Sequence, residues 1–472
     1  MKRRWVALIG AAAMAASTLA TVTAAVPASA APCDPGNSPI VCENSKPGSP
    51  ASEWEIAGNG DPGLQGFATK FSVNVGETEQ FKIKTTASSY TVDIYRLGWY
   101  GGMGARKVAS VTPIARTQPN CISDSTTGLV DCGNWAVSAS WAVPSDAVSG
   151  VYIAHLVNPV NLDSSQMTFV VRNDASHSDV LFQTSDSAWQ AYNVYGGSDF
   201  YAGIPAGRAY KLSYNRPFST RGSESGRDFL FSNEFPMLQF LERNGYDVSY
   251  MGSLDTDRRG SLLLNHKTFV STGHDEYWSG EQRSNVEQAK AAGTNLVFWS
   301  GNDAFWKTRF EPSIDASATA WRTLVCYKET KNNQKIDPSP VWTGTWRDPR
   351  FSPPADGGRP ENALSGQLFM VNGRRTDALQ VPAAYGRTRL WRNTSVATLA
   401  AGSTATLSAG TLGYEWDADV DNGFQPSGLA RYSETTVNLQ PDPAQPGAGF
   451  LLQDFGNTFG FGPATHRMTM YR

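Results

Sequence analysis

Two hydrophobic patterns divide the chain. Between Trp54 and Asn173, short runs alternate apolar with polar residues and are separated by turns rich in Gly, Pro and Ser. Such alternation predicts half-buried strands, here at 80–84, 90–94, 151–155 and 167–171. Short strands with frequent turns are typical of an immunoglobulin-like β-sandwich, which we predict for residues 54–173.

After Asn173, continuous apolar runs alternate with helical periodicity, the pattern of parallel strands and crossover helices. Three helices are indicated: one containing Trp189 and Tyr192, one at 235–244 capped by Asn233 and ended by Gly245, and one that begins with a Ser279/Gln282 capping box and closes at Gly293. The predicted strands cover 180–183, 246–250, 267–272 and 295–300. This pattern predicts an α/β domain with a mainly parallel sheet over residues 174–472.

The pattern weakens beyond residue 340, and we keep this region with the α/β domain. Residues 342–359 form a loop rich in Trp, Pro and Asp, and 455–462 are a Gly/Phe tail. Residues 389–407 are predicted to form strands. His466 in the tail and His155 in the sandwich are expected to be structural.

The N-terminus has the features of an export signal. Lys2, Arg3 and Arg4 precede an Ala-rich apolar stretch that ends in Ala28-Ser29-Ala30, a pattern that signal peptidase cleaves. An uncleaved anchor is the alternative, but Ser and Thr residues interrupt the stretch and no membrane span follows. We predict a signal peptide at 1–30, an extended arm at 31–53 and a secreted, extracellular protein.

Five cysteines in an exported chain favour disulfides. Two pairs lie close together in the sequence, Cys33 with Cys42 and Cys121 with Cys132. Cys326 is left over, and we expect a buried thiol without a catalytic role.

Charge and composition exclude some functions. The formal charge of −3 is spread without a basic stripe, which argues against nucleic acid as a partner. The chain has 14 Trp, 17 Tyr and 22 Phe with few charges, which fits an extracellular fold and also a binder of carbohydrates or small amides.

Polar clusters follow three predicted strands, at 184–187, 274–276 and 301–303. The carboxyl ends of parallel strands form the crevice where ligands bind in open α/β sheets. If the extended backbone continues, His274 and Glu276 point to one side and Asp275 to the other. A histidine and a carboxylate on one side can hold a metal or move a proton. The alternative is that Asp275 or Glu276 caps the following helix.

Several catalytic signatures are missing from the sequence. It has no G-x-S-x-G elbow, no H-E-x-x-H helix, no C-x-x-C pair and no P-loop. If the site is catalytic, metal-assisted chemistry is therefore favoured over a Ser or Cys nucleophile.

A set of motifs resembles the large (beta) subunit of N,N-dimethylformamidase and the secreted proteins that share its C-terminal domain. This resemblance implies an α/β domain of the glutamine-amidotransferase-like type after the sandwich. As a set the motifs are specific, although each alone is weak. They are 96–102, 189–193, 195–197 with Tyr201, 214–217, 241–248, 273–278, 300–303, 305–307 and 326–328.

The resemblance also implies an iron centre, Fe(III), held by two tyrosines and a glutamate. Glu276 matches the glutamate and Tyr192 the first tyrosine, and Tyr201 is chosen as the second over Tyr195. His274 matches a histidine that assists water attack on the amide carbonyl. Three further polar residues match the catalytic surroundings, Asn302 closely and the others more loosely; these are Asn302, Lys328 and Glu415.

The chain also departs from that family, because it carries a leader and a disulfide-tied arm and has no counterpart of the small subunit. Three hypotheses follow. The first is a secreted amidohydrolase that acts on linear amides, with a small extracellular amide as substrate. The second is a non-catalytic protein that binds glycans or a surface. The third is a metal-dependent hydrolase of carbohydrate polymers.

Overall fold

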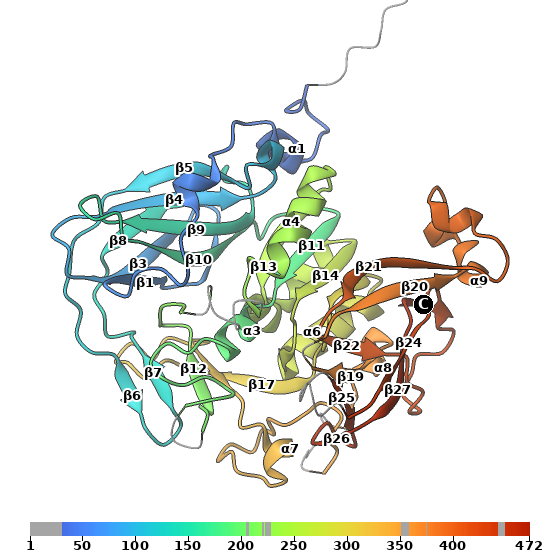
Figure 1. Cartoon of the computed structure of the whole chain (residues 1–472). Coiled ribbons are helices and arrows are strands. Elements are labelled where there is room, and N and C mark those ends of the chain that lie inside the picture. Colours follow the sequence, from blue (N-terminus) through green and yellow to red (C-terminus); the bar gives the residue numbers. More distant parts are fainter. Residues whose placement is uncertain are drawn as a thin grey trace, which may run out of the picture.

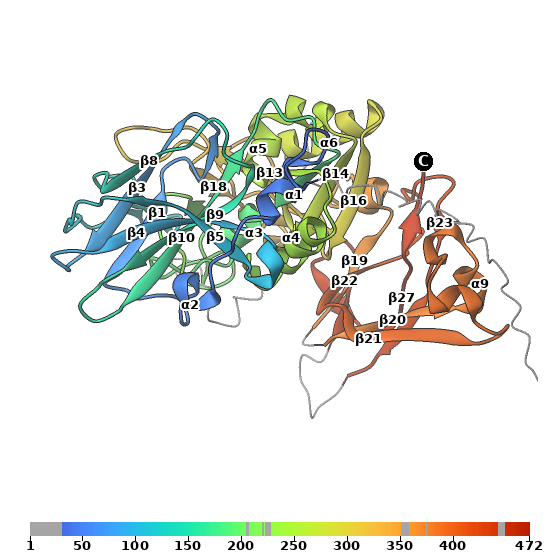
Figure 2. The ribbon, with the colours of Figure 1, turned by 90° about the horizontal axis from the view of Figure 1, so that it is seen from above.

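The computed structural model describes residues 31–203, 207–219, 221, 228–350, 358–373, 375–441 and 449–472. The predicted signal peptide lies outside the described residues. The fold is mixed α/β, consisting mostly of strands in several sheets with few helices (Figure 1). Seen from above, the N-terminal sheets, a central α/β layer and the C-terminal sheets follow one another across the molecule (Figure 2).

The N-terminal region contains two sheets, and all four strands predicted there are confirmed. The arm before them carries α1 (Pro39–Asn44) and α2 (Ala51–Trp54). One sheet has the order β1-β3-β8, with β1 (Leu64–Ala68), β3 (Thr78–Thr85) and β8 (Ala139–Ala142). The other has the order β2-β10-β9-β4-β5, with β2 (Ser72–Asn74), β10 (Ser164–Arg172), β9 (Gly150–Val157), β4 (Thr91–Leu97) and β5 (Ala105–Val111).

The five-stranded sheet is covered on both faces. Ala154 and Phe169 belong to the core that it shares with the three-stranded sheet. Val151 and Ile153 on β9 instead join the core of the central layer. This explains why seven consecutive residues of β9 are buried, where a strand with one solvated face would alternate.

The central layer is a parallel sheet with the order β13-β11-β14-β16. Its strands, at or near the predicted positions, are β11 (Val180–Thr184), β13 (Val248–Gly252), β14 (Thr268–Gly273) and β16 (Asn295–Ser300). Side chains alternate between the two faces, so Phe182 packs with α4 (Glu234–Arg243) and Leu181 with α6 (Gly280–Ala291). The other helices here are α3 (Asp186–Ala191), α5 (Ser253–Arg258) and the 3-10 helix η3 (Gly260–Asn265).

The predicted helix signals have physical counterparts. The Ser279 hydroxyl accepts a hydrogen bond from Gln282 N at 2.9 Å, which confirms the capping box of α6. Asn233 occupies the cap position of α4 but makes no side-chain capping bond. Gly245 has a φ of +72°, the left-handed conformation that ends helices.

A mixed sheet with the order β12-β18-β17-β15 lies beside the parallel one. Its strands are β12 (Lys211–Ser213), β18 (Thr323–Val325), β17 (Trp306–Glu311) and β15 (Tyr277–Ser279). The one-turn helix α7 (Glu329–Asn332) follows β18. Two more short strands, β6 (Ile122–Asp124) and β7 (Leu129–Asp131), pair with each other.

The C-terminal part forms antiparallel sheets around a core of its own. The four-stranded sheet contains β22 (Glu415–Ala418), β19 (Leu368–Asn372), β25 (Phe450–Gln453) and β26 (Thr458–Gly460). The paired strands are β20 (Asp377–Pro382) with β21 (Thr404–Leu412), β24 (Thr435–Leu439) with β27 (Gly462–His466), and β23 (Ala430–Arg431) with β28 (Thr469–Met470). The short helices are α8 (Asn362–Ser365) and α9 (Ala383–Gly386).

The prediction of strands over 389–407 is wrong for most of that range. Residues 389–391 and 395–398 form the 3-10 helices η4 and η5, and a strand begins only at Thr404. Apolar residues such as Trp391 and Val396 still pack inward. A composition typical of strands therefore occurs here in short 3-10 helices. The tail at 455–462, by contrast, contributes to β26 and β27.

The disulfide predictions are confirmed. Cys33 is bonded to Cys42 and Cys121 to Cys132. Cys326 is a buried free thiol. His155 and His466 are also largely withdrawn from solvent, His466 with its Nδ1 2.7 Å from Asp417 O. Among the described residues, no helix is both long enough and apolar enough to span a bilayer.

One buried ion pair joins the N-terminal sheets to the central layer. Arg96 on β4 donates two hydrogen bonds to Glu242 on α4, at 2.7 and 3.0 Å, and both side chains are at most 1% exposed. Glu242 also accepts from Tyr250 OH and Asn44 Nδ2, each at 2.8 Å. One carboxylate therefore connects the segment before the first strand, the N-terminal sheets, a helix and a strand of the parallel sheet.

Replacing Glu242 with Ala is expected to lower the free energy of unfolding by about 3–5 kcal/mol, because it leaves Arg96 buried and unpaired. Urea titration followed by tryptophan fluorescence measures the change. Glu77→Ala is the matched control, since Glu77 pairs with Lys70 where both side chains are 44% exposed. The Glu77→Ala change should lower the free energy of unfolding by about 1 kcal/mol or less. Equal shifts in the two variants would show that the pair does not join the two layers.

Candidate metal centre and active site

The backbone turns sharply where β14 ends and directs two functional side chains into the site. Gly273 has a φ of +77°, and a Cβ there would lie 2.8 Å from the Glu234 carboxyl group, so only glycine fits. Beyond it, His274 Nε2 and Glu276 Oε2 lie 3.6 Å apart. Asp275 points away and accepts from Gln183 and Ser271. The predicted division of the three side chains is therefore confirmed.

The alternative that these acids cap the next helix is wrong. The cap of α6 is Ser279, whose hydroxyl and partner Gln282 complete the capping box. Glu276 instead receives hydrogen bonds from tyrosine hydroxyls.

Two tyrosines converge on Glu276. Tyr192 OH donates to Glu276 Oε2 at 2.9 Å, and Tyr201 OH lies 2.8 Å from Oε1 and 2.9 Å from Oε2. The two hydroxyls are 2.8 Å apart, and the rings stack with centroids 4.6 Å apart. Tyr195, the competing candidate, packs instead beside the Cys121–Cys132 disulfide and Trp135. The structure thus brings Tyr192 and Tyr201, but not Tyr195, to Glu276.

His274 is held between two carboxylates. Its Nδ1 is 2.8 Å from Asp228 Oδ1, and its Nε2 is 2.9 Å from Glu415 Oε2. Tyr414 OH contacts both His274 Nδ1, at 3.1 Å, and Asp228. Glu415 comes from β22 of the C-terminal sheet, 141 residues further along the chain. The site is therefore built from both the central layer and the C-terminal region.

Asn302 lies next to this histidine in a strained conformation. Its φ is +55°, which is uncommon outside glycine. The Asp417 carboxylate accepts from Asn302 N at 2.9 Å and so helps to hold the turn. Asn302 Nδ2 donates to Glu415 Oε2 at 2.7 Å, while Asn302 Oδ1 is buried without a hydrogen-bond partner among the described residues. An unsatisfied buried amide oxygen at this position is consistent with a place for a ligand.

Lys328 lies on the far side of Tyr201 from Tyr192. Its Nζ is 3.4 Å from the centroid of the Tyr201 ring, whose other face Tyr192 covers. The backbone of Lys328 is left-handed, with a φ of +47°. Its Nζ is buried and has no hydrogen-bond partner in the part of the chain that the structure describes. A buried ammonium in this state is costly and marks a functional position.

Burial shifts the protonation of these groups. Burial, and then the charge of Glu276, raises the pKa of both Tyr192 and Tyr201 well above that of free tyrosine. Burial also raises the pKa of Glu276. Burial opposes the charged form of His274, but Glu415 and Asp228 outweigh it and raise the pKa of this histidine well above its usual value. Burial and the charge of Lys331 hold the pKa of Lys328 well below its usual value.

The donor set fits a hard cation. Two phenol oxygens and a carboxylate suit Fe(III), and the protons that both phenols direct at Glu276 are those a cation would displace. A second set shares Glu276: one ligand atom each from His274, Glu276 and Glu415 lie within 4.8 Å of one another. This mixed nitrogen and oxygen set would suit a divalent metal.

Sequence reasoning missed four residues of this site. Asp228 orients His274, Tyr414 contacts that pair, Tyr277 OH donates to Tyr201 OH at 2.6 Å, and Asn372 Nδ2 donates to Glu415 Oε1 at 2.7 Å. Tyr277 follows directly after the H-x-E motif, which was the one available signal. Nothing local marks Asp228 or Asn372.

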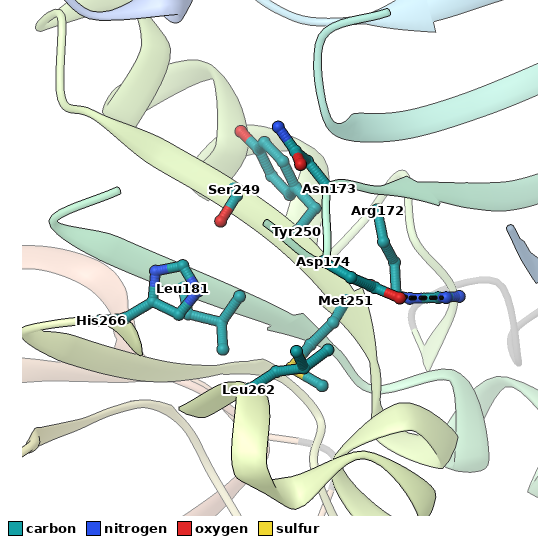
Figure 3. Close-up of a pocket in the computed structure, with 9 residues that line it drawn as sticks. All are labelled: Arg172, Asn173, Asp174, Leu181, Ser249, Tyr250, Met251, Leu262 and His266. Atoms are coloured by element: carbon teal, nitrogen blue, oxygen red, sulfur yellow. Dashed lines mark hydrogen bonds and ion pairs between the residues drawn. The ribbon is translucent and has the colours of Figure 1, made fainter. Parts of the chain in front are cut away.

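The polar cluster after β11 does not enter the site. Ser185 donates to Glu234, and Asp186 accepts from Tyr214 OH at 2.7 Å. A small cavity lies between the end of β10 and the β11–β13 pair (Figure 3). It is lined by Arg172, Asp174 and His266 among others, which bind neighbouring protein groups, and by none of the candidate site residues.

Arg216 braces the segment that carries both tyrosines. Its guanidinium is 1% exposed and donates to Gln190 O at 3.1 Å, Tyr195 O at 2.8 Å and Ser198 O at 3.3 Å. Burial lowers the pKa of Arg216 to about 9, which is the cost of placing this charge inside. Arg216 is therefore a positioning residue for Tyr192 and Tyr201.

Arg216→Met is expected to free the segment 186–203. Unfolding should become easier by about 3 kcal/mol or more, because each buried carbonyl left without a donor costs about 1–3 kcal/mol. Hydrogen exchange measured by mass spectrometry should speed up in this segment. Arg116→Met, which removes one bond to Val137 O in the N-terminal region, is the control and should leave the segment unchanged. Unaltered exchange at 186–203 in Arg216→Met would rule out the brace.

Comparison with known proteins identifies the family. A family profile described as N,N-dimethylformamidase beta subunit-like, C-terminal, matches residues 91–472. No curated protein matches the chain significantly. A solved family 123 glycoside hydrolase from Clostridium perfringens, described in terms of glycolipid glycan hydrolysis, shows 9% identity and a TM-score of 0.11, covering 42% of this chain and 32% of that one. The match thus spans about a third of that hydrolase, and at this TM-score it carries no structural argument. Because the family profile covers most of its length, the chain belongs to the N,N-dimethylformamidase beta subunit-like family, whose name indicates a hydrolase-type function.

Proposed function

We propose that the protein is a secreted hydrolase of C–N bonds in linear amides, with Fe(III) held by Tyr192, Tyr201 and Glu276. The observation that carries this proposal is the meeting of three oxygen donors, with both phenols within 2.9 Å of one carboxylate. Family membership supports the amide as substrate class. When bound, the iron would polarise a carbonyl and acidify water.

The residues around the iron site can handle the protons of such a reaction. His274 Nε2 faces the site. A cation bound beside the ring would favour its neutral form, which can take a proton from the attacking water and return it to the leaving nitrogen. Asp228 fixes the ring through Nδ1 and stabilises its cationic form. Glu415 accepts from Asn302, and its Oε2 lies 2.9 Å from His274 Nε2, so it helps to hold both side chains in place.

Two amino-bearing side chains can stabilise negative charge as it develops. Asn302 Nδ2 can donate to an oxyanion on the former carbonyl oxygen. Lys328 lies behind Tyr201. A deprotonated phenol there would favour the protonated form of the Lys328 amine, whose charge would in turn stabilise the phenolate. These roles assign catalysis to His274, Asn302, Lys328 and Glu415.

The finer domain assignment also belongs to this proposal. It comprises a signal peptide at 1–30, a disulfide-tied arm at 31–53, an immunoglobulin-like sandwich at 54–173 and a glutamine-amidotransferase-like α/β domain at 174–472. Two facing sheets with a shared core support the sandwich, and the four-stranded parallel sheet supports the α/β domain. The two disulfides and the lack of a membrane-spanning helix among the described residues are compatible with secretion.

Two alternatives remain from the sequence, a non-catalytic glycan- or surface-binding protein and a hydrolase of carbohydrate polymers. The packed donor set and the unpaired buried groups of Asn302 and Lys328 favour a catalytic site over a binding platform. Activity on glycans with none on amides would select the carbohydrate hydrolase.

Loading the purified mature protein with Fe(III) is expected to give about one iron per chain and a visible tyrosinate-to-iron absorption band, as the oxygen donor set implies. Tyr192→Phe should weaken the band, and Glu276→Gln should abolish iron binding. Elemental analysis and an absorption spectrum measure both. Tyr195→Phe is the matched control and should keep the metal and the colour, because Tyr195 packs outside the site.

Circular dichroism of each variant separates loss of metal from loss of fold. A colourless wild type that takes up no iron would contradict the iron centre and favour the binding protein. Uptake of a colourless divalent metal that is lost in Glu415→Gln but kept in Tyr192→Phe would instead select the His274–Glu276–Glu415 set.

A further inference from the structure

Cationic side chains gather where solvent reaches the site. Tyr201 is 38% exposed, although its hydroxyl points inward to Glu276. Lys331 is exposed beside it, with Nζ 5.6 Å from the Tyr201 ring centroid and 5.5 Å from that of Trp306. The Lys328 ammonium lies deeper, 4.8 Å from the same Trp306 ring. The two lysines therefore lead from the surface along one face of Tyr201 toward the site.

A third cation lies nearby. Arg208 NH2 donates to the carbonyl of Tyr327, the residue before Lys328, at 2.6 Å. Although Lys331 reaches the surface, the protein packed around its amine lowers its pKa, Glu276 raises this pKa and Arg208 lowers it. The three charges therefore lie close enough to act on one another.

These cations have no anionic partner of their own. Among the described residues, neither Lys328 nor Lys331 forms an ion pair, and Arg208 is bonded only to backbone carbonyls. Other lysines of the chain are paired, such as Lys211 with Glu311 at 2.6 Å and Lys335 with Glu329 at 3.1 Å. The nearest negative charges are those of the site acids, since Glu276 acts on both lysines and Glu415 also on Lys331. When a metal engages these acids, the cations are left to repel each other, and a ligand that supplies an anion offsets this repulsion.

We propose that the substrate is an amide that carries a carboxylate, bound by Lys331 at the mouth of the site with Arg208 and Lys328 contributing charge. This inference rests on the proposed amide hydrolysis and narrows its substrate class from linear amides in general to those that carry a carboxylate. In the reaction, water adds its oxygen to the amide carbon, the C–N bond breaks, and the leaving nitrogen takes a proton. The substrate carboxylate is unchanged and serves only for binding.

The experiment compares each anionic amide with its neutral methyl ester. N-acetylglycine carries the carboxylate on the amine side, and succinamic acid carries it on the acyl side. Binding to the iron-loaded protein is measured by calorimetry, and hydrolysis by release of amine or ammonia. The acids are expected to bind at least about tenfold more tightly than the esters, the effect of an ion pair in a partly desolvated site.

Variants test the assignment to Lys331. Lys331→Met should reduce the preference for the acid about tenfold, mainly through KM, while Lys331→Arg should retain it. Higher salt should weaken the preference, because the pair is near the surface. Lys84→Met, on an exposed position of β3, is the matched control and should keep it.

The outcomes separate this inference from the amidase proposal. Preferential binding of either acid supports recognition of an anionic ligand. If no amide is cleaved, only the proposed amide hydrolysis is rejected. Equal binding of acids and esters, or a preference that Lys331→Met leaves intact, would overturn the inference while hydrolysis of neutral amides could still proceed.

Discussion

The burial of Glu276 is the constraint on which the site depends. A carboxylate that is 3% exposed must be compensated, and two phenols supply the hydrogen bonds. The hydroxyls of those phenols point inward, where desolvation and the carboxylate both make their ionisation harder. Only a strongly charged cation would reverse this preference, since it stabilises three anionic oxygens at once. The same contacts that satisfy the metal-free site therefore assemble a ligand set.

Such a site must be held by residues outside it. Arg216 fixes the segment between Tyr192 and Tyr201, and Asp417 holds the strained turn at Asn302. Further away, the Arg96–Glu242 pair attaches the N-terminal sheets to α4, whose Glu234 accepts from Ser185 N and Ser185 OH at the start of α3. Each of these supporting residues carries an ionisable group with low exposure, so each is costly to leave without its partner. Hydrogen bonds of buried ionisable side chains therefore help to hold the site rigid, in addition to apolar packing.

Local signals in the sequence predicted much of the central layer and part of the site. The four parallel strands and the Ser279–Gln282 capping box depend on residues close together in the sequence, so local patterns were enough to predict them. The placement of His274 and Glu276 on one side followed from the alternation of extended backbone. The C-terminal sheets were not predicted, because antiparallel pairing between distant segments leaves little local trace, and apolar residues at 389–398 were mistaken for strands. Asp228 could not be found at all, since it meets His274 across 46 residues.

Negative and positive side chains are separated within the site, with the acids inside and a lysine toward solvent. The carboxylates of Glu276, Glu415 and Asp228 lie inside around His274, whereas the exposed ammonium of Lys331 lies toward solvent. A cation that binds inside would balance the acids and leave the outer lysines uncompensated. The field at the entrance would then attract anions more strongly in the metal-loaded protein than in the metal-free one. Metal binding and substrate charge are therefore coupled through this arrangement, although no residue at the entrance needs to touch the metal.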